Sequence, residues 1–328
     1  VACIEQLYTG LVRAAPGELP AVARQSIADD ANWHVAHPVN DLRGIGAIVS
    51  HFLEPLRRAL PDLERRPYIS LAGEDSGQYW VDGTGYFSGT FRRPLFGIPP
   101  TGGALFLRYT EMARIVDGRI AEYYLIPDFL DAMRQAGVYP LAPPRGTAEL
   151  VPPPATMDGL YRPVADPAHG ADSRALVMAM LDCLRTYDGE RLESMALEHF
   201  WDPDFHWYGP GGIGTTRGIA GFREFHQGPF LRAFPDRDVD HHASTIACGD
   251  FVATGGWPHM HGTHSGDGWL GTPASGRHLG MRVMDIWRRQ GDRLRENWVA
   301  IDIPHMLMQM GKDIFAQADQ NGGSENHG

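Results

Sequence analysis

The sequence predicts an α+β protein of two tandem domains, on the basis of an internal repeat, a recurring order of elements and a proline-rich connection. Arg43-Gly44 recurs as Arg217-Gly218, and Asp128 recurs as Asp302. Both pairs share one offset, since 217 − 43 and 302 − 128 each equal 174. A constant offset across unrelated residue types indicates that one ancestral domain was duplicated. The same offset relates Leu60-Pro61-Asp62 to Phe234-Pro235-Asp236, and Gly97, Pro99 and Gly102 to Gly271, Pro273 and Gly276.

The length of 328 residues agrees with two domains. We expect the first copy over residues 1–139, a linker over 140–168, the second copy over 169–317 and a flexible tail over 318–328. The linker is rich in proline, which is incompatible with a regular helix or a central strand. The tail is polar and glycine-rich, as frayed termini often are.

Each copy repeats the same order of elements. A helix opens it, most clearly over 173–195, where Leu176, Met180 and Leu184 return at helical spacing. A short aromatic strand follows (32–36 and 205–208), then a glycine-containing turn and a second helix (45–60 and 219–234). The remainder reads as strands separated by Gly/Asp turns. Helices followed by antiparallel strands form an α+β plan, and a curved antiparallel sheet packed on N-terminal helices would enclose a cone-shaped pocket in each copy.

Composition and charge exclude several classes of partner. The formal net charge of −11 argues against non-specific binding to nucleic acid or to an anionic membrane. No apolar run approaches the ~18 residues that a spanning helix requires, and the first residues show no signal peptide. Three cysteines without CxxC spacing suit reduced thiols. We therefore expect a cytoplasmic protein.

Carboxylates near the end of each copy are the first candidates for chemistry. Side chains alternate along a strand, so Glu296, Trp298 and Asp302 would share one face of the last strand. Glu122, Tyr124 and Asp128 repeat this pattern, and the preceding strands carry Asp285 and Glu111. Apolar surroundings raise the pKa of a carboxylate, and two such groups on neighbouring strands could divide acid and base roles. Alternatively, the two glutamates pair with arginines, and Asp128 and Asp302 cap the following helices.

Histidines and aromatic residues distinguish the second copy. His206 and its counterpart His34 lie on the short aromatic strand, and His261 and His264 are further candidates for hydrogen bonding or acid/base work. His259 and His261 form a His-x-His pair without a third placed ligand, so no metal site is expected. We expect His226, His241 and His242 at the surface. A pocket floor for a hydrophobic ligand could come from Trp257, Trp269, Trp298 and Tyr208, with Trp33 and Tyr124 in copy one; the alternative is an aromatic core.

Motifs for other chemistries are missing from the sequence. We find no P-loop, no dinucleotide-binding GxGxxG, no HExxH and no GxSxG. Nothing in the residues calls for a cofactor, and none is expected.

The second copy resembles the SnoaL-like polyketide cyclases of the nuclear-transport-factor-two-like, or ketosteroid-isomerase-like, superfamily. The stretch 262–266 (GTHSG), continuing to 270–276 (LGTPASG), is similar to their GTHxG…GxPxTG signature. The stretch 293–298 followed by Asp302 is similar to their closing GRIxExW…D motif, and 226–236 to their helix and its exit. Copy one matches more loosely. Phe91 stands where the signature has His264, and Glu111 and Asp285 stand where many relatives carry histidine.

The resemblance implies a curved antiparallel sheet around a pocket, dimerisation through sheet packing, and a cofactor-free aldol reaction in which Asp302, and by repeat Asp128, acts as acid/base. From it and from the residues we expect an acid/base enzyme of cyclase, isomerase or lyase type acting on a small hydrophobic oxygenated substrate. Asp302 would move a proton at carbon, Asp285 (Glu111 in copy one) would orient or share it, and His206, His261 or His264 would polarise an oxygen.

Alternatives are a hydrolase or dehydratase of the same superfamily, a non-catalytic binder of small ligands, and metal-dependent hydrolysis through His259 and His261. The two copies are expected to pair as an intramolecular pseudo-dimer, and whole chains could form a homodimer.

Overall fold

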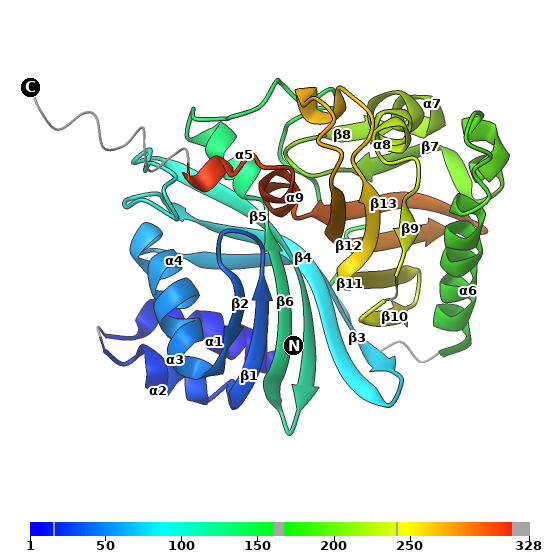
Figure 1. The fold of residues 1–328 in the computed structure, drawn as a ribbon. Coiled ribbons are helices and arrows are strands. Elements are labelled where there is room, and N and C mark those ends of the chain that lie inside the picture. The colour runs from blue at the N-terminus through cyan, green and yellow to red at the C-terminus, as the bar shows by residue number, and fades with distance from the viewer. Residues whose placement is uncertain (16, 161–166, 241, 317–328) are drawn as a thin grey trace, which may run out of the picture. The chain divides into compact units, whose positions relative to one another are not determined.

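A computed structural model of the protein describes residues 1–15, 17–160, 167–240 and 242–316. It divides into two compact units (Figure 1). Unit 1 contains Val1–Pro67, Ser76–Pro140 and the chain from Asp302 onward, and unit 2 contains Tyr68–Asp75 and Leu141–Ile301. The expected tail 318–328 and residues 161–166 of the expected linker lie outside the described residues. Both units are α+β, as predicted, with a curled sheet that does not close.

Unit 1 begins with two helices, of which the first is amphipathic. Ile4, Leu7, Tyr8 and Leu11 recur at helical spacing and are all buried. The strands form one sheet in the order β2-β1-β6-β5-β4-β3. The elements are α1 (Ala2–Arg13), α2 (Leu19–Arg24), β1 (Ile27–Val35), β2 (Asn40–Arg43), α3 (Gly44–Ile48), η1 (Val49–Leu53), α4 (Glu54–Ala59), β3 (Glu64–Asp75), β4 (Gln78–Thr90), β5 (Ala104–Val116), β6 (Arg119–Pro127), α5 (Phe129–Gln135) and α9 (Ile303–Gln309).

Unit 2 repeats this plan with a sheet in the order β10-β11-β12-β13-β7-β8, to which β9 adds by pairing with β11. Its elements are α6 (Pro167–Leu184), η2 (Leu192–Met195), η3 (Leu197–His199), β7 (Trp201–Tyr208), β8 (Thr215–Arg217), α7 (Gly218–Phe222), η4 (Arg223–Gln227), α8 (Gly228–Ala233), β9 (Asp238–Val239), β10 (Ser244–Cys248), β11 (Phe251–Thr263), η5 (Trp269–Gly271), β12 (His278–Gln290) and β13 (Arg293–Ile301).

The opening helix of unit 2 differs from the helix expected over 173–195. It ends at Leu184, and a separate 3-10 turn covers Leu192–Met195. Asp188 explains the interruption, because its Oδ1 accepts hydrogen bonds from the backbone N–H groups of Glu190 and Arg191, at 2.9 and 2.7 Å. Such local side-chain bonds stabilise a turn in competition with a helix.

The second helix of each repeat lies where it was expected but is discontinuous. A π-helical turn, η1 or η4, separates its two α-helical segments. Pro55 and Pro229 stand in the first turn of the segment that follows. Proline has no N–H and cannot make the usual bond to the preceding turn, which favours a locally widened helix. The widened turn of unit 2 contains His226.

One strand pair in each sheet is parallel. The first strand lies beside the last, β1 with β6 and β7 with β13, whereas the other pairs are antiparallel. This pairing sets Trp33 opposite Tyr123 and Trp207 opposite Asn297. An aromatic side chain from the start of each repeat thereby reaches the face of the closing strand. Within the described residues, no helix has the length and apolar character needed to cross a bilayer.

Candidate active site

The strand register decides which carboxylates share a face. Asp285 on β12 lies opposite Val299 on β13. Side chains alternate along a strand, so Asp285 shares its face with Asn297 and not with Glu296. We call the face that carries Asp285, Asn297 and Trp207 the inner face of unit 2; it packs on the helix α7–η4–α8 through Trp207. Asp285 and Glu296 therefore do not share one pocket.

Asp302 is not part of the closing strand. β13 ends at Ile301, and Asp302 is the N-cap of α9, fully buried in unit 1. Its Oδ1 accepts the N–H of His305 at 3.1 Å, and its Oδ2 accepts the N–H of His37 at 3.0 Å. Asp128 caps α5 in the same way through Asp131, at 3.1 Å. Asp302 and Asp128 therefore cap helices, as the structural alternative predicted, and both carboxylate oxygens of Asp302 accept hydrogen bonds from backbone amides.

Asp285 has the environment expected of an acid/base group. Burial raises the pKa of its carboxyl group from 3.8 to about 7, with a smaller opposing effect from Asn297. Asn297 Nδ2 donates to Asp285 Oδ1 at 3.2 Å and to the Ile286 carbonyl at 3.2 Å, which fixes the orientation of the amide. No arginine, lysine or histidine among the described residues forms an ion pair with Asp285. Part of its surface stays accessible, so the carboxyl group is not sealed off.

Thr254 and Trp207 share the inner face with Asp285, and His226 packs on Trp207. Thr254 lies directly opposite it on β11, buried, and its hydroxyl has no hydrogen-bond partner among the described residues. Trp207 lies opposite Asn297, and the ring of His226 stacks on it at 4.2 Å. Burial lowers the pKa of His226 to about 3, so its imidazole is neutral at physiological pH. The site thus combines one titratable carboxyl group with neutral hydrogen-bonding groups.

The equivalent place in unit 1 is filled by a charged network. Glu111 is buried and pairs with Arg65 through Oε1, while the Tyr123 hydroxyl donates to its Oε2. The hydroxyl of Tyr8 lies 3.3 Å from that of Tyr123, and burial raises the pKa of both phenols. Trp33 is fully buried, with its ring 4.5 Å from that of Tyr123. Both oxygens of Glu111 are therefore occupied by groups of the protein itself.

The opposite, outer face of unit 2 holds another group of expected residues. Trp298 is fully buried and stacks on Tyr208 at 5.2 Å, and its Nε1 donates to the Pro152 carbonyl at 3.1 Å. Glu296 is buried and pairs with Arg288 at 2.6 Å, as the ion-pair alternative predicted. Packing by the 141–160 segment occupies this face, so Trp298 and Tyr208 do not line the Asp285 site. His206 lies beside them, 3.1 Å from Arg217; burial and this arginine lower its pKa.

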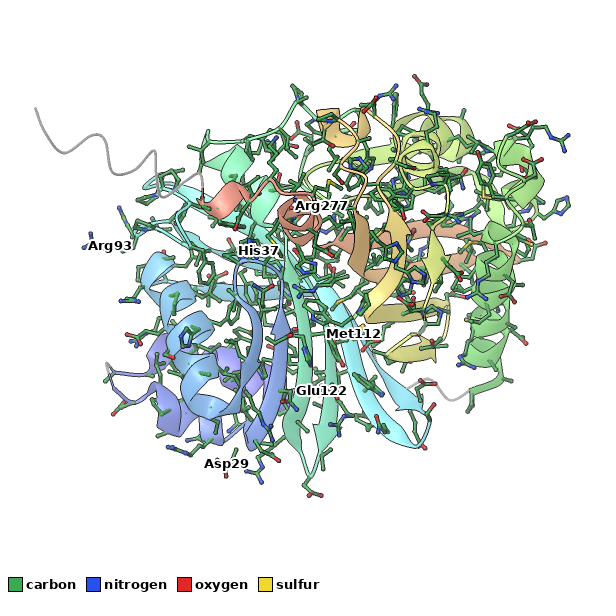
Figure 2. All side chains as sticks on the ribbon, viewed as in Figure 1. Asp29, His37, Arg93, Met112, Glu122 and Arg277 are labelled. Atoms are coloured by element: carbon green, nitrogen blue, oxygen red, sulfur yellow. The ribbon has the colours of Figure 1, made fainter. Side chains whose placement is uncertain are left out.

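The outer face of unit 1 carries a half-exposed polar group around Glu122 (Figure 2). Arg114 pairs with Glu122 at 3.0 Å, and Tyr124 donates to it at 2.7 Å. A hydrogen bond from His34 is the main reason why the pKa of Glu122 falls to about 2. Burial opposes charging of His34, but Glu122 and Asp41 together raise its pKa. His34 and Tyr124 thus lie on the face opposite Glu111.

The remaining expected residues lie on β11 or shortly after it in the chain. His264 is buried beneath Trp269, its Nδ1 lies 3.2 Å from the Ser275 hydroxyl, and burial lowers its pKa. His261 is part-exposed and bonds to Asp240 at 2.8 Å. Trp257 stacks under the guanidinium of Arg282, at 4.3 Å. The described residues contain no group of three His, Cys, Asp or Glu side chains placed to hold a metal ion.

Two residues near Asp285 were not predicted from the sequence, His226 and Asn297. His226 is not a surface residue, because it is enclosed by Trp207, Phe222 and Phe230. The repeat indicates a buried position for His226, because the offset of 174 pairs it with Phe52, and phenylalanine is a residue type that packs in cores. Asn297 was placed correctly on the face opposite Glu296, but its hydrogen bond to Asp285 depends on the register of two strands. His242 is part-buried, with its ring 4.9 Å from that of His259, and His241 lies outside the described residues.

Comparison with known proteins matches both repeats to one family. The family model described as SnoaL-like polyketide cyclase matches residues 6–136 and 176–310. Among solved structures, AclR, a candidate hydroxylase from Streptomyces galilaeus, is 24% identical over 44% of this chain and 87% of its own, with a TM-score of 0.35. IdmH, a candidate polyketide cyclase from Streptomyces antibioticus, is 25% identical over 42% and 97%, with a TM-score of 0.35. A candidate polyketide cyclase from Acidithiobacillus ferrooxidans is 20% identical over 46% and 98%, also at 0.35. No curated protein matches the chain.

Proposed function

Because the chain belongs to the SnoaL-like polyketide cyclase family, we propose that unit 2 catalyses proton transfer at carbon on a small hydrophobic oxygenated substrate. Asp285 is the acid/base group of this proposal. The observation that carries it is a part-buried carboxyl group with a pKa of about 7 and no ion-pair partner among the described residues. General acid/base catalysis is most efficient when the pKa of the group lies near the working pH.

The proposed step begins with Asp285 as its carboxylate. It removes a proton from a carbon next to a carbonyl group, and the resulting carboxylic acid returns the proton at a second position or to an oxygen. Asn297 holds Oδ1 of Asp285 by its hydrogen bond and leaves Oδ2 for the substrate. Enolisation of this kind is the first step of aldol cyclisation and of isomerisation. In an aldol-type lyase reaction the same base would remove the proton of a hydroxyl group, and cleavage of the C–C bond would produce the enolate. The chemistry needs only side chains of the protein.

Neutral donors would stabilise the negative charge that develops on the substrate oxygen. The hydroxyl of Thr254, opposite Asp285, is available for this hydrogen bond. Donors that are already oriented in a water-poor site lower the barrier, because they need no reorganisation during the reaction. His226 acts as a neutral imidazole against the aromatic wall that Trp207 provides, and so adds no positive charge that would lower the pKa of Asp285.

Unit 1 is proposed to have lost this chemistry. Both oxygens of Glu111 are bound by Arg65 and Tyr123, which leaves neither free for a substrate proton. The two repeats are further proposed to pair with one another as subunits of a dimer do, and the duplication is what supports this proposal.

Hydrogen–deuterium exchange tests the proposal without knowledge of the natural substrate. A cyclic ketone fused to an aromatic ring, such as 2-tetralone, dissolved in D2O with the protein, should lose its acidic C–H signals in NMR spectra faster than in buffer. Asp285→Asn should reduce the protein-catalysed rate by about 10²-fold or more. The matched control is Asp128→Asn, which changes a helix cap of unit 1 and should leave the rate unchanged.

A folded Asp285→Asn protein with undiminished exchange would remove Asp285 from the reaction. A non-catalytic binding protein gives a different pattern, with binding of the ketone but no exchange above buffer. Such a protein also has no requirement for a carboxyl group that titrates near neutrality.

A further inference from the structure

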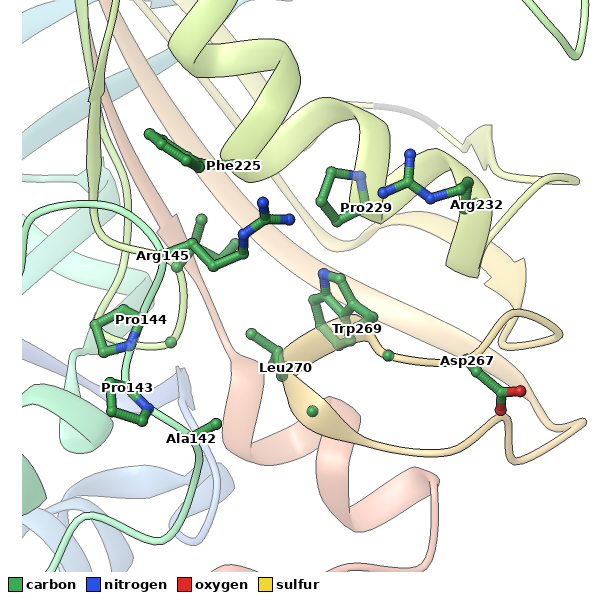
Figure 3. A pocket seen from close by; sticks show the side chains of 14 residues that line it. Ala142, Pro143, Pro144, Arg145, Phe225, Pro229, Arg232, Asp267, Trp269 and Leu270 are labelled. Carbon is green, nitrogen blue, oxygen red and sulfur yellow. The ribbon is translucent and has the colours of Figure 1, made fainter.

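A cavity of about 330 Å³ lies in unit 2, apart from the proposed active site (Figure 3). Its volume is at the small end of the range for ligand-binding pockets. Asp285, Asn297 and Trp207 are not among the residues that line it. The walls come from four segments that are distant in sequence: 142–145, 212–213, the helical stretch 225–232 and the loop 267–271.

Backbone hydrogen bonds hold Arg145 in the wall of this cavity. The N–H of Gly146 donates to the Ile213 carbonyl at 2.9 Å, and Thr147 and Thr215 exchange two further bonds at 2.9 and 2.8 Å. A Cβ atom on Gly146 would lie 2.7 Å from the backbone of Gly214, so only glycine permits this approach. The backbone directly after Arg145 is therefore held against residues 213–215, which fixes the point from which the Arg145 side chain extends.

Two arginines line the cavity from opposite sides. Figure 3 shows the side chains of Arg145 and Arg232 directed from opposite sides towards Pro229. The Arg145 guanidinium lies over the ring of Phe225, 5.5 Å from its centroid, and 3.7 Å from the exposed carboxylate of Glu224. Within the described part of the chain, Arg232 has no carboxylate partner.

The acidic residue of the cavity does not neutralise these arginines. Asp267 lines the cavity, but its Oδ1 accepts the N–H of Ala274 at 2.7 Å and so serves its own loop. The chain has a formal net charge of −11, and against this background the cavity lining carries two guanidinium groups and one carboxylate, which is a local excess of positive charge. An anion is the ligand that such a site attracts.

The rest of the lining is apolar and includes a large aromatic ring. Trp269 is 3% exposed and is held from behind by Phe234, with ring centroids 5.3 Å apart. Leu270 has a φ of 53°, a left-handed conformation that is unfavourable for a branched side chain. Non-glycine residues in this conformation occur preferentially at ligand sites. Leu270 lies beside Trp269 in Figure 3, at the same wall of the cavity.

We propose that this cavity is a second binding site of the protein, which takes a small aromatic carboxylate. The guanidinium groups of Arg145 and Arg232 bind the carboxylate, and the flat ring of the ligand packs on Trp269 and Leu270. Guanidinium groups match the geometry of a carboxylate, with two parallel N–H···O bonds for each arginine that binds end-on. Tryptophan provides a rigid apolar surface for an aromatic ring.

Isothermal titration of the full chain with 2-naphthoate tests this proposal. The neutral 2-naphthamide has the same ring system without the charge and should bind at least about tenfold more weakly, because each lost charge-assisted hydrogen bond weakens binding by that order. Arg145→Gln and Arg232→Gln should each weaken naphthoate binding by about tenfold or more. Both side chains are exposed, so the variants should fold.

Two controls separate this site from others. Arg93→Gln removes one exposed arginine of unit 1, away from the cavity lining, and should leave the affinity unchanged (Figure 2). Asp285→Asn should also leave it unchanged, since the proposed active site is separate. The proposal is overturned if wild-type protein does not bind 2-naphthoate at about 1 mM, the weak limit of specific binding. It is equally overturned if the Arg145→Gln/Arg232→Gln double variant binds as wild type does, or if Asp285→Asn abolishes binding.

Discussion

Replacement of Asp285 by asparagine is expected to stabilise the protein at neutral and alkaline pH. Folding raises the pKa of this carboxyl group from 3.8 to about 7. Each pKa unit corresponds to about 1.4 kcal/mol, so the ionised form opposes folding by at most about 4 kcal/mol. Asparagine has the same shape, carries no charge and still accepts the hydrogen bond from Asn297. The variant should recover most of this free energy of unfolding above pH 7.

The sign of the pH dependence follows from the direction of the shift. The folded state binds the proton of Asp285 more tightly than the unfolded state does. The stability that this proton contributes is complete below pH 3.8, is lost as the pH rises towards about 7, and is absent above that value. The difference in free energy of unfolding between Asp285→Asn and wild type should therefore be near zero at pH 4 and reach its full value at pH 8.

Urea denaturation followed by tryptophan fluorescence, from pH 4 to pH 8, measures this difference. The matched control is Glu111→Gln, because residue 111 occupies the same place in the other repeat (111 + 174 = 285). Glu111 is ion-paired with buried Arg65, so its neutralisation leaves that cation with the part-exposed carboxylate of Glu5 as its remaining ion-pair partner. Loss of one partner of a buried ion pair destabilises by about 3 to 5 kcal/mol. The same chemical change should therefore have opposite effects in the two repeats.

The stability of Asp285→Asn at pH 8 can contradict this reasoning. If Asp285→Asn is no more stable than wild type at pH 8, the charge of Asp285 is compensated in solution. Its pKa is then not raised, and the physical basis for its proposed role as an acid/base group is lost.

Three further outcomes are expected. His226→Phe introduces the residue found at position 52 and should increase the free energy of unfolding in acid. The pKa of His226 is lowered to about 3, so the stability that its neutral ring contributes is complete above pH 6.5 and is lost as the pH falls. Urea titrations of the variant and of wild type at pH 4 and pH 7 measure this difference. Asp302→Ala should lower the free energy of unfolding by about 2 kcal/mol or more, because a helix cap and a buried acceptor are lost together. The rate of ketone exchange per folded molecule should not change. A loss of exchange in the folded variant would restore Asp302 as the acid/base group. The pH profile of kcat/KM for exchange should fall on the acid side with a midpoint near 7, the pKa of Asp285, and a midpoint near 4 would contradict that assignment.

The duplication, the α+β class and the family could be predicted from sequence because each leaves a local signal. The offset of 174 appears in turn residues such as Gly44 and Gly218, which have positive φ in both repeats. The signature 262–276 encodes a strand exit and its loop. Such features depend on short segments of chain, and the structure preserves them.

The candidate site was only partly predictable, because it depends on where strands end and how they pair. Asp302 appeared to continue the alternation of the last strand, but the strand ends one residue earlier and the side chain caps a helix. The raised pKa of Asp285 reflects missing neighbours on other strands, which no local pattern records. His226 was expected at the surface on its residue type alone, although its place in the repeat matches Phe52.

The divergence of the repeats is coherent when the two inner faces are compared position by position. The offset of 174 sets Val239 where unit 1 has Arg65, and Asn297 where it has Tyr123. The first difference removes the cation that balances the acidic group, and the second replaces a phenol that donates to it by a smaller amide.

Both differences act on the carboxyl group in one direction. Without a cation its charged form is stabilised less, and with less bulk beside it some of its surface stays accessible. The same fold therefore holds an acidic group in two conditions. In unit 1 the carboxylate is held by an arginine and a tyrosine. In unit 2 the carboxyl group has no cation beside it within the described part of the chain, has a pKa near neutrality and is partly accessible. That state is unfavourable for stability, and it is the state that the proposed role of Asp285 in proton transfer requires.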